Sequence, residues 1–198
     1  MQTLNTNISL ELPSPVQRVN EPLFSEKGIE LFLKREDLIH PNLGGNKWRK
    51  LKPNLHRARK QKKSCLLTFG GAFSNHISAT AAAGKYFSFQ TIGLIRGEEP
   101  SGPNPTLDFA RSCGMQLKFV SREQYRLKHR PEFLDRLLER PGEQLYLIPE
   151  GGTNLLAVKG ARDIAREWYQ QHPDWLPDFW CLPVGTGGTI SGLIWELQ

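Results

Sequence analysis

Residues 65–84 read CLLTFGGAFSNHISATAAAG and have the pattern of a strand, a glycine-rich loop and a helix. The run CLLTF is short and apolar and stops at two glycines, so it predicts a buried strand. The segment Asn75–Tyr86 is rich in alanine, the strongest helix former, and predicts a helix. This unit is typical of α/β proteins, in which helices cover a parallel sheet.

The same alternation of short apolar runs and longer helical segments continues along the chain. Strands are predicted at Ile29–Lys34, Cys65–Phe69, Gln90–Ile95, Met115–Val120, Gln144–Ile148 and Asp178–Val184. Helices are predicted at Gly45–Lys63, Asn75–Tyr86, Pro105–Ser112, Pro131–Glu139, Leu155–Gln170 and Thr189–Leu197. In a parallel sheet of this kind, ligands bind in the loops that follow the carboxyl ends of the strands.

The composition is that of an ordinary soluble protein, with 38% hydrophobic and 23% charged residues, and excludes collagen and coiled coils. No apolar run approaches the roughly 18 residues of a membrane helix, and the first residues do not resemble a secretory signal. The three distant cysteines, Cys65, Cys113 and Cys181, predict reduced, mostly buried thiols and no zinc site. We therefore expect a cytoplasmic protein without a metal or a membrane partner.

The positive charge is concentrated in Lys47–Lys63, which holds nine basic residues and no acidic one. The chain as a whole carries a formal net charge of +6, so the remainder is slightly acidic. The distal part, Arg57–Lys63, is predicted to be the solvated face of a helix. A nucleotide- or RNA-binding module is an alternative, but the chain lacks the acidic residue that such a glycine loop places on a ribose.

Two glycine-rich loops have the features of a cofactor site. Val184–Thr189 (VGTGGT) follows a predicted strand and opens a predicted helix, so it predicts either an anion site or a plain tight turn. Leu43–Lys50 (LGGNKWRK) places Lys47 and Lys50 three residues apart, on one helix face. A lysine amine becomes a useful nucleophile when burial or another cation lowers its pKa, and Lys50 and Arg49 supply cations next to Lys47.

Two further loops have the same position between a strand and a helix. In Phe69–His76 (FGGAFSNH), Ser74 is predicted to cap the helix, whose N-terminus is also suited to a carboxylate. In Ile148–Asn154 (IPEGGTN), a capping turn is the simplest interpretation, with Glu150 facing solvent.

The four loops together are far more specific than any one of them. KREDL at 34–38 and GGNKWRK at 44–50 resemble the signature of fold-type II pyridoxal-phosphate enzymes, the tryptophan synthase β superfamily. With TFGGAFSNHISATAAAG, IPEGGTN and VGTGGT, the chain is similar to the 1-aminocyclopropane-1-carboxylate deaminase and D-cysteine desulfhydrase family over nearly its whole length. The resemblance implies two Rossmann-like parallel-sheet α/β domains with pyridoxal 5'-phosphate in the cleft between them.

The resemblance also implies the residues of the site. Lys47 would bind the cofactor covalently and transfer protons, with Ser74 as a second catalytic residue. Asn75 would bind the ring hydroxyl oxygen of the cofactor. The phosphate would be held by Lys50, Gly185, Thr186, Gly187, Gly188 and Thr189. The substrate would be held by Asn46, Ser74, Asn75 and His76, the last three binding its carboxylate.

The implied activity is that of a lyase or deaminase that acts on a small amino acid and releases ammonia and a 2-oxo acid. D-cysteine and 1-aminocyclopropane-1-carboxylate stay open as substrates, and a homodimer is implied. The small domain would span 46–149, and 1–45 with 150–198 would form an incomplete large domain that lacks a partner for the pyridine nitrogen. A truncated, inactive relative is therefore an alternative. Pro53 predicts that the lysine helix bends or restarts there.

Overall fold

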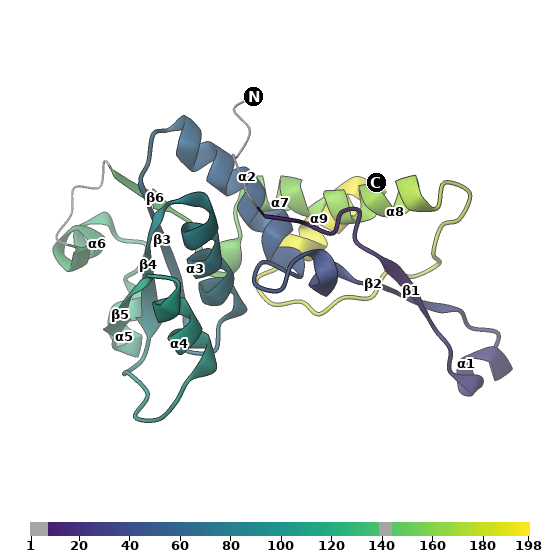
Figure 1. The fold of residues 1–198 in the computed structure, drawn as a ribbon, viewed down its shortest axis with the longest axis horizontal. Coiled ribbons are helices and arrows are strands. Elements are labelled where there is room, and N and C mark those ends of the chain that lie inside the picture. Colours follow the sequence, from purple (N-terminus) through teal and green to yellow (C-terminus); the bar gives the residue numbers. More distant parts are fainter. Residues whose placement is uncertain (1–7, 139–143) are drawn as a thin grey trace.

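The computed structural model describes residues 8–138 and 144–198, and one parallel sheet organises half of the molecule (Figure 1). Its four strands lie in the order β5-β4-β3-β6 and are all parallel. The strands are β3 (Cys65–Gly71), β4 (Gln90–Arg96), β5 (Gln116–Val120) and β6 (Leu145–Leu147). The chain runs from β3 to β4 and β5 and then returns to the other side of β3, so the strand order reverses between β3 and β6. Such a switch point is where α/β sheets bind ligands.

Helices cover both faces of this sheet, which explains why its central strands are continuously apolar. Leu66 faces one core that is shared with α2 (Asn46–Lys60) and α3 (Asn75–Phe87). Ile95 contributes to a core shared with α3 and α4 (Pro105–Ser112). Leu67 faces the opposite core with α5 (Arg122–Arg126) and α6 (Pro131–Leu138), because neighbouring side chains of a strand point to opposite faces.

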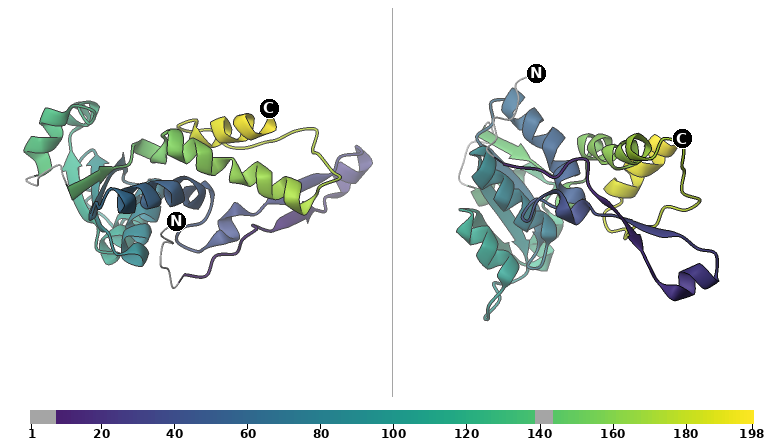
Figure 2. Two further views of the ribbon diagram at one scale, coloured as in Figure 1. Left: turned by 90° about the horizontal axis from the view of Figure 1, so that it is seen from above. Right: turned by 45° about the vertical axis from the view of Figure 1, so that its right-hand side comes forward.

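The remaining elements lie on the far side of α2, where three helices and a hairpin form the other half of the molecule (Figures 1 and 2). The helices are α7 (Leu155–Ala161), α8 (Asp163–Gln171) and α9 (Gly188–Leu197). The hairpin pairs β1 (Val16–Val19) with β2 (Leu31–Lys34) in antiparallel fashion and carries α1 (Pro22–Glu26) at its tip. Two short 3₁₀ turns, η1 (Glu36–Ile39) and η3 (Glu150–Gly152), complete the described elements.

Helix α2 does not restart at Pro53 but runs as one helix from Asn46 to Lys60. Proline has no N–H, so the carbonyl of Arg49 lacks its usual partner one turn later. Helix α7 packs against this carbonyl through Gly160, where an added Cβ would lie 2.0 Å from the Arg49 oxygen. Only glycine therefore allows the two helices to approach this closely.

The structure confirms the α/β class and most of the predicted elements, and it corrects three predictions. The segment 178–184 is not a strand, because no described strand lies beside it to share ladder hydrogen bonds. The single helix predicted over 155–170 is two helices that meet at Arg162. The cysteines were expected to be mostly buried, but only Cys65 is buried, whereas Cys113 is half-buried and Cys181 is exposed. The end of the helix predicted at 131–139 lies outside the described residues. The domain boundaries stay a prediction.

Candidate functional site

The first turn of α2 begins at a glycine pair that the backbone requires. Gly45 has a φ of +65°, and a Cβ on Gly44 would lie 2.6 Å from the Asp37 carbonyl oxygen. Side chains other than glycine rarely fit either condition. This turn places Asn46 and Lys47 at the start of the helix, directly after the loop.

The Lys47 amine is partly buried, and no acidic side chain within residues 8–138 and 144–198 pairs with it. Its Nζ donates to Asn46 Oδ1 at 2.7 Å, and burial lowers the pKa of the ammonium group. Lys47, Asn46 and Asn75 line a cavity of about 380 Å³. Asp37 lines the same cavity, but its carboxylate pairs with Arg35 at 2.7 Å. Lowering of the pKa increases the share of free amine, the form that attacks a carbonyl carbon.

Lys50 is buried more deeply, with 2% of its surface exposed. Its Nζ donates to Thr153 Oγ1 at 3.0 Å, and a Cβ on Gly188 would lie 3.1 Å from this nitrogen. Burial, and then the charge of Lys47, lower the pKa of Lys50 to about 8. Among the described residues, neither lysine forms an ion pair. A buried cation of this kind is suited to an anionic ligand.

The loop before α9 lies over Lys50. Thr186 and Thr153 share a hydrogen bond of 2.5 Å between their hydroxyls, and Asn46 Nδ2 donates to Thr189 Oγ1 at 2.7 Å. Gly187 has a φ of +80°, and no side chain caps α9. The first N–H groups of the helix are therefore not occupied by a cap, and the loop joins them to two lysines and several hydroxyls. This combination has the chemistry of a phosphate site.

The His76 ring is buried at the switch point, and its hydrogen bonds define its tautomer. Thr68 Oγ1 donates its only proton to the Ile148 carbonyl at 2.9 Å, so at 2.8 Å it accepts a proton from His76 Nε2. Burial, with the charges of Lys47 and Lys50, lowers the pKa of His76 to about 3. The ring is therefore neutral, and Nδ1 carries a buried lone pair without a described partner.

The N-terminus of α3 places the remaining predicted residues in two directions. Ser74 Oγ accepts from the Ile77 N–H as the predicted cap. Ser74 also lines a separate cavity of about 780 Å³ with Arg96 and Arg122, whereas Asn75 lines the cavity of Lys47. The structure thus brings Asn46, Lys47, Lys50, Asn75 and the glycine loop together, whereas the Ser74 side chain lines the neighbouring cavity.

Sequence reasoning missed Thr153 as a member of this site. Its loop was predicted to be a capping turn, and Asn154 does cap α7 by accepting from the Ala157 N–H at 2.9 Å. The signal for Thr153 was its position directly after two glycines and before a helix, because Thr189 of VGTGGT also follows two glycines.

In the described part of the chain, no helix is long and apolar enough to cross a membrane. The same residues contain no group of three or more histidine, cysteine or acidic side chains arranged to hold a metal ion.

An α/β sheet with a desolvated lysine beside a glycine-rich anion site defines a class of enzymes that bind a phosphorylated cofactor. The chain belongs to the family described as pyridoxal-phosphate dependent enzyme, which matches residues 9–198. The cofactor of this family is pyridoxal phosphate, as predicted. The residues present fit it, since Lys47 offers an amine to its aldehyde and the loop before α9 offers a cradle to its phosphate.

The chain is also similar in sequence and structure to proteins named as deaminases or desulfhydrases. The chain is 34% identical over 92% of its length to the Arabidopsis thaliana bifunctional D-cysteine desulfhydrase/1-aminocyclopropane-1-carboxylate deaminase, mitochondrial, of which it covers 48%. It is 35% identical over 96% of its length to a putative 1-aminocyclopropane-1-carboxylate deaminase of Thermotoga maritima, of which it covers 60%. A solved ACC deaminase homologue superimposes with a TM-score of 0.80 at 28% identity, over 97% of this chain and 58% of that one. The chain thus spans about half the length of these relatives.

Proposed function

We propose that this chain carries the cofactor-binding part of a pyridoxal-phosphate-dependent lyase or deaminase that acts on a small amino acid. The observation that carries the proposal is the pair formed by the partly buried Lys47 and the buried Lys50. Neither lysine has a described acidic partner, and the Lys50 amine lies next to Gly188 at the uncapped N-terminus of α9. Such a pair is costly in a folded protein unless an anion or a covalent partner neutralises it.

Each residue of the site then has a definite task. Lys47 would hold the cofactor through its amine and would serve as the group that moves a proton at the substrate carbon, while Asn46 would orient this amine. Lys50 and the N–H and hydroxyl groups of Gly185–Thr189 would bind the phosphate, and Asn75 would bind the ring oxygen. When bound, the cofactor serves as an electron sink that stabilises negative charge next to the substrate nitrogen.

The substrate carboxylate is placed at the N-terminus of α3, by Ser74, Asn75 and His76. For His76 this contact comes from the backbone N–H, because its side chain is buried and its Nδ1 lone pair would repel an anion. The N-terminus of a helix favours a negative group.

D-cysteine and 1-aminocyclopropane-1-carboxylate are the proposed substrates, because both occur in the names of the relatives. The products would be ammonia and a 2-oxo acid, with sulfide in addition from D-cysteine. A homodimer in the cytoplasm is part of the same proposal, although the plant relative is named as mitochondrial.

Titration of the chain with pyridoxal phosphate, followed by borohydride reduction and peptide mapping, tests the proposal. We expect a new visible absorption band and a reduced adduct on Lys47. Lys47→Ala removes both, and Lys52→Ala, an exposed lysine of the same helix, retains both. An adduct spread over surface lysines would contradict the proposal.

An inactive relative that still binds the cofactor is the second candidate, because the chain spans only about half the length of its relatives. Assays of the pure chain with D-cysteine and with 1-aminocyclopropane-1-carboxylate separate the two. Turnover that disappears in Lys47→Ala supports the lyase, and an adduct on Lys47 without turnover supports the inactive relative.

A further inference from the structure

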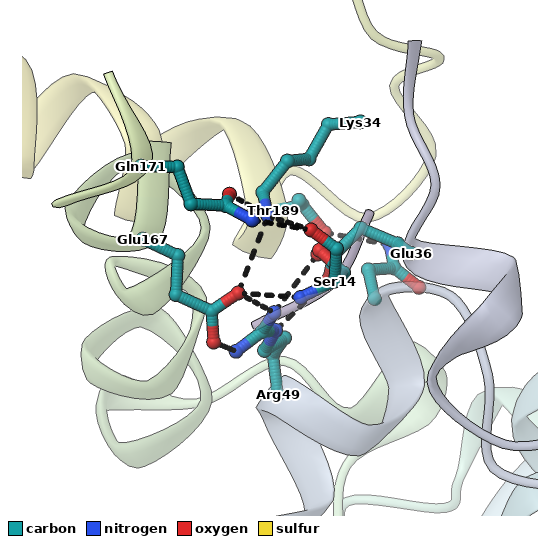
Figure 3. Close-up of polar contacts among 8 residues, drawn as sticks. Ser14, Lys34, Glu36, Arg49, Glu167, Gln171 and Thr189 are labelled. Carbon is teal, nitrogen blue, oxygen red and sulfur yellow. Dashed lines mark hydrogen bonds and ion pairs between the residues drawn. The ribbon is translucent and has the colours of Figure 1, made fainter. Parts of the chain in front are cut away.

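A cluster of four largely buried charges surrounds Arg49 of α2 (Figure 3). We call Lys34, Glu36, Arg49 and Glu167 the ion-pair cluster. The Arg49 guanidinium donates to both oxygens of Glu36 at 2.9 Å and to those of Glu167 at 2.6 and 2.7 Å. Lys34 Nζ lies 3.3 Å from Glu167. Two positive and two negative groups balance, so the cluster has no need of a ligand.

Ser14 and Gln171 complete the hydrogen bonds of the cluster. Ser14 Oγ donates to Glu36 at 2.6 Å, and the Ser14 N–H donates to Glu167 at 3.0 Å. Lys34 Nζ donates to the Ser14 carbonyl at 2.6 Å and to Gln171 Oε1 at 2.8 Å. The cluster therefore joins the N-terminal segment, η1 and α8 to a single side chain of α2.

The backbone at Arg49 lacks one of the hydrogen bonds of its own helix and is packed against a neighbouring helix instead. The Arg49 carbonyl receives no bond from Pro53, and Gly160 of α7 packs directly against it. The Arg49 side chain is 3% exposed and binds two separate elements through a rigid guanidinium fork. Tertiary contacts of Arg49 therefore add to the helix hydrogen bonds in fixing the turn that bears Lys47 and Lys50.

We propose that Arg49 is a positioning residue, which holds the first turn of α2 so that the Lys47 and Lys50 amines stay desolvated and aimed into the cofactor site. This placement of the amines can be measured on the chain without a cofactor. Its importance for catalysis rests on the function proposed above.

The test measures how reactive Lys47 is toward an amine-acetylating reagent across pH, in the chain without cofactor, by peptide mapping. The charged group beside Lys47 is Lys50, His76 is neutral, and Asp37 is paired with Arg35. Arg49→Lys keeps the charge but loses the fork. We expect the midpoint of the Lys47 profile to rise toward the ordinary lysine value of about 10.4, because a loosened turn admits water.

Arg162→Lys is the matched control. Arg162 forms an ion pair of 2.6 Å with Glu196, and this pair lies outside the candidate site. The Lys47 midpoint of this variant should equal that of the parent. Glu36→Gln separates positioning from simple electrostatics. Removal of a negative charge by itself lowers a lysine pKa, whereas loss of positioning raises it. A raised midpoint supports the proposal. An unchanged or lowered Lys47 midpoint in Glu36→Gln would overturn the proposal. This second variant decides the question even if Arg49→Lys does not fold.

This readout is independent of the proposed function, because no cofactor is added. A raised midpoint together with no binding of pyridoxal phosphate would refute the function and leave the positioning role intact. If pyridoxal phosphate binds to Lys47 but both folded variants keep the parental midpoint, the proposed function stands and the positioning role is refuted.

Discussion

Arg49 and Lys50 are neighbours in the sequence and are almost equally buried, at 4% and 2% exposed, yet their surroundings are opposite. Burial alone would lower the pKa of Arg49, but its hydrogen bonds to Glu167 and Glu36 outweigh this and raise it. In the described part of the chain, the Lys50 amine donates to a hydroxyl and to no carboxylate, and burial with the charge of Lys47 lowers its pKa to about 8. A balanced buried charge serves the structure, whereas an unbalanced one indicates a ligand.

Replacement of Arg49 by methionine should have the largest effect, because it leaves Glu36 and Glu167 buried with only Lys34 between them. Breaking a buried ion pair in this way costs about 3–5 kcal/mol. Urea unfolding of Arg49→Met checks this loss in the free energy of unfolding. Lys52→Met, on the exposed side of α2, is the control and should change little. A loss below about 1 kcal/mol would show that the cluster contributes nothing net.

Replacement of Gly160 by alanine should disturb the surroundings of both Arg49 and Lys50. The added Cβ would lie 2.0 Å from the Arg49 carbonyl, so α7 has to move away from α2. Overpacking of this kind costs about 1–3 kcal/mol. Gly102→Ala, whose Cβ would meet nothing within 4 Å, is the matched control in the same unfolding experiment. Equal stability of both variants would contradict the close approach of the helices.

Replacement of Lys50 by methionine should change stability in the opposite direction, because it removes a buried unpaired charge. The pKa shift of this charge from 10.5 to about 8 corresponds to a gain of at most about 3 kcal/mol at neutral pH. Affinity for pyridoxal phosphate should fall about ten- to a hundredfold, since a charged hydrogen bond to phosphate is worth about 1.5–3 kcal/mol. Lys60→Met, exposed at the end of α2, should change neither quantity. Unfolding curves and phosphate-competed binding titrations measure both, and a large loss of stability would contradict the contrast with Arg49.

The same variant carries a pH signature. Because the pKa of Lys50 is about 8 in the folded chain and 10.5 in the unfolded one, the unfolded chain holds more protons between these values. The free energy of unfolding of the parent should therefore rise with pH across this window, relative to that of Lys50→Met. A constant difference between the two proteins would show that Lys50 titrates normally.

Local patterns predicted most of the helices and the parallel strands, because each had its own apolar period and its own glycine loop. The strand predicted over 178–184 is wrong for a physical reason, since a strand needs a neighbour and no local pattern reveals whether one is present. The hairpin of β1 and β2 was only half predicted, because its first strand, Val16–Val19, is short and largely polar.

For the candidate site, the glycine loops and the spacing of Lys47 and Lys50 pointed to residues that the fold brings together, because phosphate chemistry requires those residue types. The ion-pair cluster was not predictable. Glu36 and Glu167 look like ordinary surface acids in the sequence, and Arg49 meets Glu167 across 118 positions. The tautomer of His76 depends equally on Thr68, which is an unremarkable strand residue until the fold places it.

The Asn46–Thr189 hydrogen bond joins positions 143 residues apart, and the Lys50–Thr153 bond spans 103. Contacts of such long range form late in folding, because the loop they close costs entropy before it gains any contact. The parallel sheet is complete in sequence by β6, whereas the phosphate cradle waits for α9. During synthesis the strands of the sheet are therefore all made before the loop that covers Lys50, so the sheet can form while the phosphate cradle is still unassembled.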